Sequence, residues 1–397
     1  MKKIKIHVSP RTKFLIVVFS LLNLFIYIFI LGFHNAIPFS SFDYFRNAHH
    51  FIKDSRVSEH KFKLINNLAQ YDAQWYLKIA ENGYPTTSSK EDLSNRSFSG
   101  LSFAFFPMYP ATIGVLNFIF RNILLSAFLF SNLMLFVNFV SLIFVARKIE
   151  SEDIAIKTTF LLFFFPFSIF YRSYFTESLF LFLLIWFSYF FIKKQNKLSG
   201  LFLGLLNITR GAGVLIYIPY FYYLLQDFRK KKVNIVQLIQ SVALSVIPIA
   251  LWVFYVYHKT GDLFYFMKTR SAWTGEHSFV NQIIDNINRV AIFSSQALHS
   301  FHSSKIDIAV ILLVFSILVF SLGQINKKLW LISLCIFLAP LIFNDTMSYT
   351  RMQIVSFPLF LFISKILRKE MVYFMFALFY VGLLITSIIF INWYWVG

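Results

Sequence analysis

Long apolar runs alternate with short basic clusters along this chain, and the runs set its fold class. After a basic amino terminus the first run continues to Gly32, and further runs occupy 123–146, 154–171, 176–192, 199–226, 234–257, 306–323, 329–343, 352–366 and 371–393. A helix of about 20 apolar residues is long enough to cross a bilayer. With 199–226 counted as two short spans broken at 209–213, the pattern predicts an all-α polytopic membrane protein of about eleven transmembrane helices.

The polar stretch after the first run is predicted to form a first external loop at 34–122. Within it, 70–84 has the pattern of an amphipathic helix, because Tyr71 and Trp75 lie four residues apart on one apolar face. Gly83 can adopt the left-handed conformation that ends a helix. The sequence therefore predicts a short helix that lies on the membrane surface with its aromatic rings at the level of the lipid headgroups.

The stretch 103–120 could cross the membrane or lie on its outer surface, and the basic clusters decide between the two topologies. If 103–120 crossed, the clusters at 147–148 and 193–197 would lie outside the cell. If it is a second surface helix, every short basic cluster falls on the cytoplasmic side, as the positive-inside rule requires. The sequence therefore predicts a multi-pass protein of the cell (cytoplasmic) membrane, with a cytoplasmic amino terminus and a second external loop at 258–305.

Composition narrows the class of protein and its partners. The chain is 58% hydrophobic and 20% aromatic, which excludes an ordinary soluble domain. A net charge of +19 could indicate nucleic acid, but the basic residues form small clusters between apolar runs instead of a stripe on one face. We therefore expect membrane lipid, and no nucleic acid, as the partner of these charges. No soluble domain is evident, so residues 1–397 are predicted to form a single membrane-embedded domain.

Ionisable residues from separate parts of the chain map to the predicted outer boundary: Asp72, Glu177, Arg210 and Arg351. Charged groups near a membrane are costly and usually have partners or a function. Glu177 also has a structural explanation, as a carboxylate at a helix N-terminus with Thr176 as its cap. The two arginines also have structural explanations. Arg210 could lie along apolar surface with its charged end in water, and Arg351 could form a surface ion pair with Asp345. Because glycines follow Arg210 and let backbone approach closely, a phosphate oxygen suits it better.

Several motifs that would carry other chemistry are absent from the sequence. There is no His-Glu-x-x-His segment and no paired Cys or His at ligand spacing, so no metal site is predicted. There is also no P-loop and no Gly-x-Gly-x-x-Gly segment that opens a helix, which argues against a nucleotide-driven pump. We expect no metal and no cofactor.

Several motifs in one order resemble a known family. They are Asp-x-x-Trp with Ile-Ala-x-x-Gly-Tyr in 72–84, Phe-Phe-Pro-x-Tyr-Pro at 105–110, Thr-Glu-Ser-Leu-Phe at 176–180, Thr-Arg-x-x-Gly at 209–213, Gly-Asp at 261–262 with Trp273, and Arg351 with Phe-Pro at 357–358. Together they resemble the PIG-V-like mannosyltransferases, in the GT-C class of membrane glycosyltransferases. Tyr71 and Phe175 stand where the family has Trp and Tyr.

The resemblance implies a GT-C-like bundle that transfers a sugar, mannose in the family, with inversion. The donor would be a polyprenyl-phosphate sugar, and the acceptor a lipid-linked or cell-envelope glycan on the outer face of the membrane. Asp72 would accept the proton of the acceptor hydroxyl, and Glu177 would hold a sugar hydroxyl or position Arg210. Arg210, together with Arg351, would bind the donor phosphate.

The remaining expected substrate contacts form a wall and two loop positions. The wall is aromatic and would stack on the sugar and exclude water: Tyr71, Trp75, Tyr76 and Tyr109. Asp262 and Trp273 are expected to bind substrate because they match the family motif in place. Two other functions stay open from the residues alone, namely a membrane transporter or flippase for a lipid-linked or polar solute, and a noncatalytic membrane partner.

Overall fold

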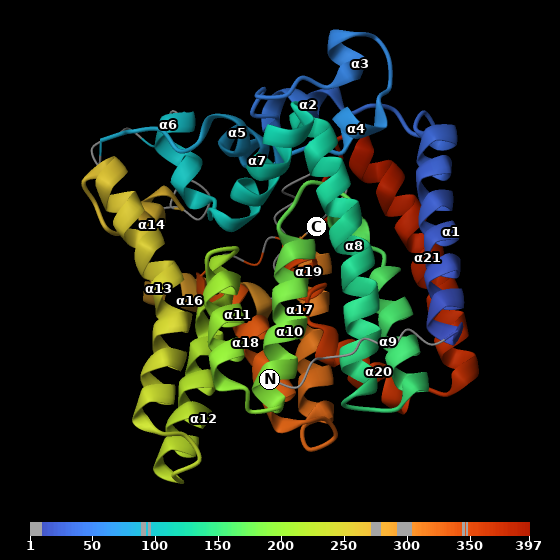
Figure 1. Ribbon diagram of the computed structural model, residues 1–397. Helices are drawn as coiled ribbons and strands as arrows, with labels where there is room; N and C mark the ends of the chain where they lie inside the picture. The colour runs from blue at the N-terminus through green and yellow to red at the C-terminus, as the bar shows by residue number, and fades with distance from the viewer. Residues whose placement is uncertain are drawn as a thin grey trace.

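All regular structure in the described chain is helical. The computed structural model describes residues 10–88, 93, 97–270, 279–291, 304–343, 346 and 348–397, and every regular element in these residues is a helix (Figure 1). The all-α fold class predicted from the sequence is therefore confirmed.

The longer helices run side by side as a bundle in Figure 1. They are α1 (Pro10–Phe33), α8 (Ile123–Arg147), α9 (Glu152–Phe163), α10 (Glu177–Ile192), α11 (Asn196–Asn207), α12 (Tyr217–Arg229), α13 (Ile235–Thr260), α17 (Ser304–Ser321), α18 (Lys327–Phe343), α20 (Phe357–Ile366) and α21 (Lys369–Ile391). Aromatic rings fill the contacts between them. Phe19 of α1, for example, stacks on Phe139 of α8 with the ring centroids 3.9 Å apart. Such contacts account for the high phenylalanine content of the chain.

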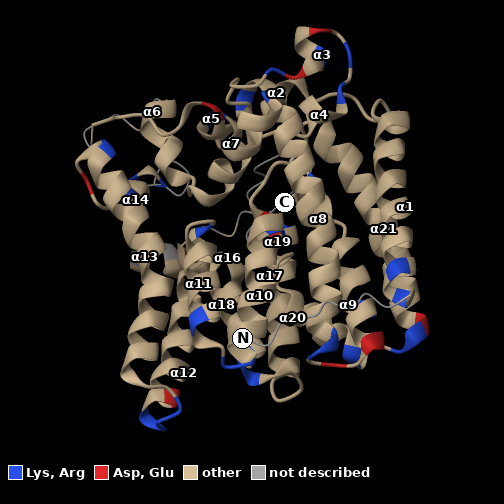
Figure 2. Cartoon of the chain, in the orientation of Figure 1, with Lys and Arg blue, Asp and Glu red and all other residues tan. Residues whose placement is uncertain are grey.

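The first predicted loop folds as a layer across one end of the bundle (Figure 1). Its helices are α2 (Ser41–Asn47), α3 (Ser55–Ser58), α4 (Leu64–Asn67), α5 (Ala73–Asn82), α6 (Phe98–Leu101), η2 (Ser102–Ala104) and α7 (Met108–Phe120). Shorter elements elsewhere are η3 (Ser168–Tyr171), η4 (Gly211–Ile216), α14 (Tyr265–Thr269), α16 (Phe279–Ala291) and α19 (Tyr349–Gln353). Figure 2 shows that charged residues gather in the loop layer and at the opposite end of the bundle, while the helices between carry few of them.

Four helices of the described chain are long and apolar enough to cross a membrane: α1, α8, α13 and α21. A fifth is obtained if the α6–η2 segment and α7, which are bent by 112° relative to each other, count as one span. Helices α10 and α20 are apolar but shorter. The described residues therefore give four or five candidate spans by length and composition, fewer than the number expected from the sequence.

Two stretches predicted as continuous spans are interrupted by proline. In 154–171, helix α9 ends before Pro166, whose ring disfavours a helical conformation at the preceding residue, and η3 follows. In 352–366, α19 ends and α20 begins anew, with Pro358 in its first turn. Each of these two predicted spans therefore contains two helical elements and not one. The second interruption matters for the site, because it leaves α19 as a short separate element.

Helix α5 forms in the predicted place, but its apolar face contacts protein. The helix ends at Gly83, as predicted, with a positive φ of 70°, but the ψ of −173° lies outside the left-handed helical region that was expected. Trp75 has no exposed surface and stacks on Phe105, with the ring centroids 5.3 Å apart. The aromatic stripe therefore contacts protein and not lipid headgroups. An apolar stripe can be buried equally well by protein or by lipid, and the sequence does not distinguish the two.

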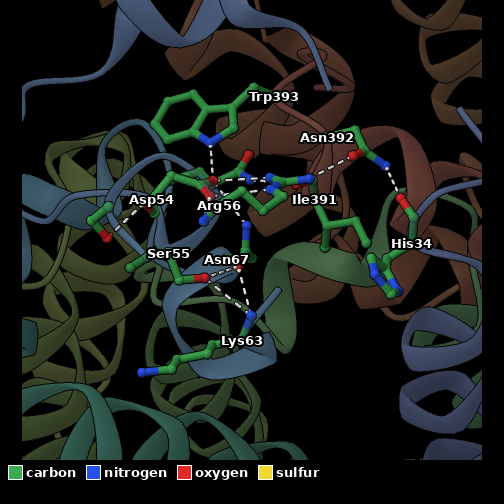
Figure 3. Close-up of polar contacts among 12 residues, drawn as sticks. His34, Asp54, Ser55, Arg56, Lys63, Asn67, Ile391, Asn392 and Trp393 are labelled. Atoms are coloured by element: carbon green, nitrogen blue, oxygen red, sulfur yellow. Dashed lines mark hydrogen bonds and ion pairs between the residues drawn. The ribbon is translucent and has the colours of Figure 1, made fainter. Parts of the chain in front are cut away.

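The loop layer is fastened to the segment after α21 by a buried ion pair, shown in Figure 3. Arg56 donates to both carboxylate oxygens of Asp54, at 3.1 and 2.9 Å, and to Asn392 Oδ1 at 2.6 Å. Trp393 Nε1 and Asn67 Nδ2 each donate to Asp54 Oδ2 at 2.8 Å. We call this group the Asp54 latch. It connects residues that are more than three hundred positions apart in the chain.

The latch keeps Asp54 ionised. Burial by itself would raise the pKa of Asp54, but the hydrogen bonds and the charge of Arg56 outweigh it and lower the pKa below its ordinary value. Because the folded-state pKa is the lower one, the stabilisation is fully present above the unfolded pKa of about 3.9. It is lost as the pH falls from there through the folded pKa.

We expect Asp54→Ala to lower the stability of the folded protein by up to about 3–5 kcal/mol, because it leaves a guanidinium that is only 14% exposed without its carboxylate. Thermal unfolding of the purified protein in detergent at neutral pH measures this. The matched control is Glu59→Ala in the same layer, whose side chain is 46% exposed in its pair with Lys63 and which should cost under about 1 kcal/mol. Equal unfolding temperatures for the two variants would contradict the role of the latch.

Candidate functional site

Asp72 is held at the start of α5 by a strained turn. It directly precedes the helix, and Tyr71 before it has a φ of 50°, a left-handed conformation that is uncommon for a non-glycine residue. The Tyr71 hydroxyl donates to the Trp393 carbonyl oxygen at 2.6 Å. The segment after α21 therefore fixes the turn that presents Asp72.

Glu177 is the first residue of α10 and has no exposed surface. Its Oε1 atom accepts a hydrogen bond from Arg210 Nη1 at 2.8 Å and another from Arg351 Nε at 2.6 Å. The helix N-terminus and the two guanidinium groups together stabilise the ionised carboxylate. Thr176 makes no side-chain capping bond, so the predicted cap is wrong.

Arg210 lies in the predicted break between α11 and η4. Its backbone is extended, with a φ of −159° and a ψ of 132°, so the helix is interrupted there. Glycine at position 213 lets the chain return close to α11, because a Cβ atom there would lie 2.0 Å from Leu206 Cδ2. The break is therefore confirmed, and it turns the Arg210 side chain toward Glu177.

Arg351, on α19, joins Glu177 to Asp72. Besides its bond to Glu177, its Nη1 donates to Asp72 Oδ2 at 3.1 Å. The guanidinium carbon lies 5.1, 4.6 and 5.5 Å from the ring centroids of Phe170, Phe175 and Trp395. Burial alone would lower the pKa of Arg351, but the two carboxylates raise it above the ordinary arginine value, so the group remains a cation. Its suggested partner Asp345 lies outside the described residues.

Asp307, on α17, fixes α19 and was not found from the sequence. Its carboxylate accepts from the Ser348 backbone N–H at 3.1 Å, and from the backbone N–H and the hydroxyl of Thr350, each at 2.9 Å. These bonds satisfy the start of α19 and so hold Arg351 in place. The partners are about forty residues away in the sequence, and no local signal joins them.

The charged residues meet at a cavity of about 200 Å³ between the loop layer and the bundle. Its charged wall consists of Asp72, Arg210, Arg270 and Arg351. Its apolar wall includes Phe106, Pro340, Phe343 and Met352. Arg270, which follows α14, was also missed by sequence reasoning, and it donates a hydrogen bond to the Phe343 carbonyl oxygen at the end of α18.

The four charged side chains of the site differ in how much of their surface is exposed. Asp72 is 29% exposed and Arg210 is 16% exposed, while Arg351 is 6% exposed and Glu177 is fully buried. Asp72 and Arg210 can therefore touch a molecule in the cavity. Glu177 lies behind them, which favours the predicted alternative that it positions Arg210 over the one that it holds a sugar hydroxyl.

Of the predicted aromatic wall, only Tyr76 lines the cavity. Burial first, and then the charge of Asp72, raise the pKa of Tyr76 above its ordinary value, so its hydroxyl stays protonated and can donate a hydrogen bond. Tyr71 and Trp75 contact other parts of the protein, as described above. Tyr109 is buried with its hydroxyl 3.3 Å from Ser131 Oγ.

Of the two loop positions expected to bind substrate, the structure describes Asp262, which does not line the cavity. Asp262 forms an ion pair with Lys268 and accepts from the Phe264 backbone N–H at 2.9 Å, and it is not part of the cavity wall. Trp273 lies outside the described residues. Among the described residues, no three His, Cys, Asp or Glu side chains come close enough together to hold a metal ion.

Comparison of the chain with protein-family models, curated proteins and solved structures finds no match. The functional reading of the site therefore depends on its own geometry.

We expect Asp307→Ala to destabilise the protein, because two backbone N–H groups and one hydroxyl lose their buried acceptor at a cost of about 1–3 kcal/mol each. Thermal unfolding in detergent measures the loss. Asp153→Ala serves as the control, since its side chain is 58% exposed in a pair with Lys157 and should contribute under about 1 kcal/mol. If the Asp307 variant is as stable as the control, the carboxylate does not hold α19.

Proposed function

We propose that this chain is an inverting glycosyltransferase of the cell membrane that moves a sugar from a polyprenyl-phosphate donor to the hydroxyl of a lipid-linked or cell-envelope glycan acceptor. Mannose is the first sugar to test, because of the motifs shared with PIG-V-like enzymes. The observation that carries the proposal is the cavity in which the carboxylate of Asp72 faces the guanidinium groups of Arg210 and Arg351. Transfer from a phosphate needs this combination of a base and a stabilised anion.

The carboxylate supplies the base. Its Oδ2 atom is held by Arg351, and no described residue donates to its Oδ1 atom, which is available to an acceptor. In the proposed step the Asp72 carboxylate takes the proton of the acceptor hydroxyl, and the acceptor oxygen forms a bond to the anomeric carbon. The bond from that carbon to the phosphate oxygen breaks on the opposite face, so configuration inverts.

The cations receive the leaving group. The electron pair of the broken bond stays on the polyprenyl phosphate, whose growing negative charge is stabilised by Arg210 and by the positive potential of Arg351. Both groups are fixed by Glu177 before a ligand binds, so little reorganisation is needed during the reaction. The apolar wall and Tyr76 would exclude water, which competes with the acceptor.

The proposed topology has the loop layer on the outer face of the membrane. Figure 2 is consistent with this, because charged residues also gather at the far end of the bundle, where α8 and α12 end in basic residues. The positive-inside rule assigns that end to the cytoplasm. A lipid-linked donor would then have its tail beside the bundle and its head at the cavity. About eleven spans result if helices α9–α12, α17, α18 and α20 also cross the membrane.

We expect Asp72→Asn to abolish transfer while donor binding is kept, because the variant keeps the shape of the side chain and loses the base. The loss should be about 10²–10⁴-fold in turnover. The assay follows label from a panel of polyprenyl-phosphate sugars, mannose first, into lipid and glycan extracts with purified protein. Glu59→Gln, an exposed carboxylate in the same layer, is the control and should transfer at the wild-type rate.

Two outcomes would contradict the proposal. One is an Asp72→Asn variant that transfers sugar as fast as the control. The other is the absence of transfer by the wild-type protein with every donor over a broad acceptor range, and this result would favour the transporter or noncatalytic alternatives.

A further inference from the structure

The hydrogen-bonding capacity of Arg351 is directed at protein groups. Its Nε and Nη1 atoms bind Glu177 and Asp72, at 2.6 and 3.1 Å, and aromatic rings lie against its guanidinium group. With 6% of its side chain exposed, it has little surface for a ligand. Its geometry is that of a group that holds two carboxylates in a fixed relation, which is a positioning role.

Arg210 is differently placed. Among the described residues, one hydrogen bond, from Nη1 to Glu177, holds one edge of its guanidinium group, and 16% of the side chain is exposed where it lines the cavity. A guanidinium presents several N–H donors in a planar fork. Those not used on Glu177 can therefore meet an anion in the cavity.

Arg270 approaches the same cavity from a different element. It follows α14, lines the cavity wall, and is anchored by a hydrogen bond to the carbonyl oxygen of Phe343 at the carboxyl end of α18. Burial, and then the positive charge of Arg210, lower the pKa of Arg270 to about 10, so it is still protonated at neutral pH. Arg210 and Arg270 therefore approach one cavity from two different elements.

We propose that Arg270 and Arg210 together form the anion-binding face of the cavity, with Arg351 as a positioning residue that ties Asp72 to Glu177. The described cavity wall carries three guanidinium groups and one carboxylate, which favours a ligand of negative charge. Phe343 and Met352 add apolar surface to the wall of the same cavity. A lipid monophosphate fits this combination, because its phosphate meets the arginines while the first carbons of its chain lie against the apolar wall.

The inference rests on the proposed function for the identity of the lipid phosphate, but binding can be measured without sugar transfer. The probe is a short-chain polyprenyl monophosphate, whose binding to purified full-length protein in detergent is followed by thermal stabilisation and by displacement of a radiolabelled copy. Inorganic phosphate and the neutral polyprenol of equal chain length form the other two arms. Binding of the polyprenyl monophosphate well above both would indicate that the phosphate and the chain are recognised together.

We expect Arg270→Gln to weaken binding of the polyprenyl monophosphate by about tenfold or more, since it removes a charge-assisted contact. Binding of the polyprenol should hardly change. Arg270→Lys should restore part of the affinity, which shows that a folded variant is being compared, and Arg46→Gln, on α2, should bind like the wild type. Wild-type affinity in Arg270→Gln would overturn the proposal. Preference for inorganic phosphate over the lipid monophosphate would overturn the assignment of a lipid ligand.

Arg351→Gln tests the division of roles. It should reduce kcat for sugar transfer strongly, because Asp72 and Glu177 lose their connection, and change binding of the polyprenyl monophosphate by much less than Arg270→Gln does. Arg270→Gln should mainly raise the KM for the donor. An equal loss of binding in both variants would overturn the positioning role of Arg351.

The proposed function and this inference can fail separately. If the wild-type protein binds the polyprenyl monophosphate through Arg270 but transfers no sugar from any donor, the anion site is supported and the transferase is not. If the wild-type protein transfers sugar and Arg270→Gln has an unchanged KM and unchanged binding, the transferase is supported and the anion site at Arg270 is overturned.

Discussion

The buried carboxylate of Glu177 is the interaction on which the site depends. A carboxylate with no exposed surface is costly unless cations hold it, and Arg210 and Arg351 both donate to its Oε1 atom. These three residues come from the start of α10, the break after α11, and α19. Removing any one would leave an uncompensated charge, so the pairings fix how the three elements meet. Arg351 then carries the connection outward to Asp72 in the loop layer.

The loop layer must itself be fixed for Asp72 to keep this position. The Asp54 latch and the Tyr71 hydroxyl both bind the short segment after α21, through Trp393 and its neighbours (Figure 3). The same segment contributes Trp395, whose ring lies against both Tyr71 and Arg351. The carboxyl-terminal segment therefore links the layer above the cavity to the guanidinium group at its base. This linkage is a reason to expect that changes far from the cavity alter its geometry.

Sequence reasoning found the ionisable residues that stand out from their apolar neighbours in the sequence. It missed the residues whose role depends on contacts with distant parts of the chain. Asp72, Glu177, Arg210 and Arg351 stand out because ionisable groups are rare near apolar runs, and the structure brings all four together. The break at Arg210 and the stop at Gly83 were also predictable, because glycine marks both. These signals are local, so a single sequence is enough to read them.

The features that sequence reasoning missed are not local. Asp307 is important because it caps α19, a short helix about forty residues away in the sequence. Arg270 is important because its position after α14 places it in the cavity wall. Hydrophobic pattern likewise identifies an apolar face without identifying what covers it, so Trp75 was expected at the membrane surface and is buried in protein. Pro166 and Pro358 lie within apolar runs. Because each run is apolar throughout, it was read as one span, and the helix breaks beside these prolines were not predicted.

The depth of the charges also bears on how the cavity would work. A buried ion pair contributes little net stability when both members are fully desolvated, so its presence near a cavity calls for another explanation. Here the deepest member, Glu177, neutralises one side of each arginine, and the more exposed groups Arg210 and Asp72 are left facing the cavity with opposite charge. Their separation is set by side chains that no ligand needs to touch. A rigid base and a rigid cation at a set distance favour a reaction in which a proton is taken at one end of a substrate while negative charge appears at the other.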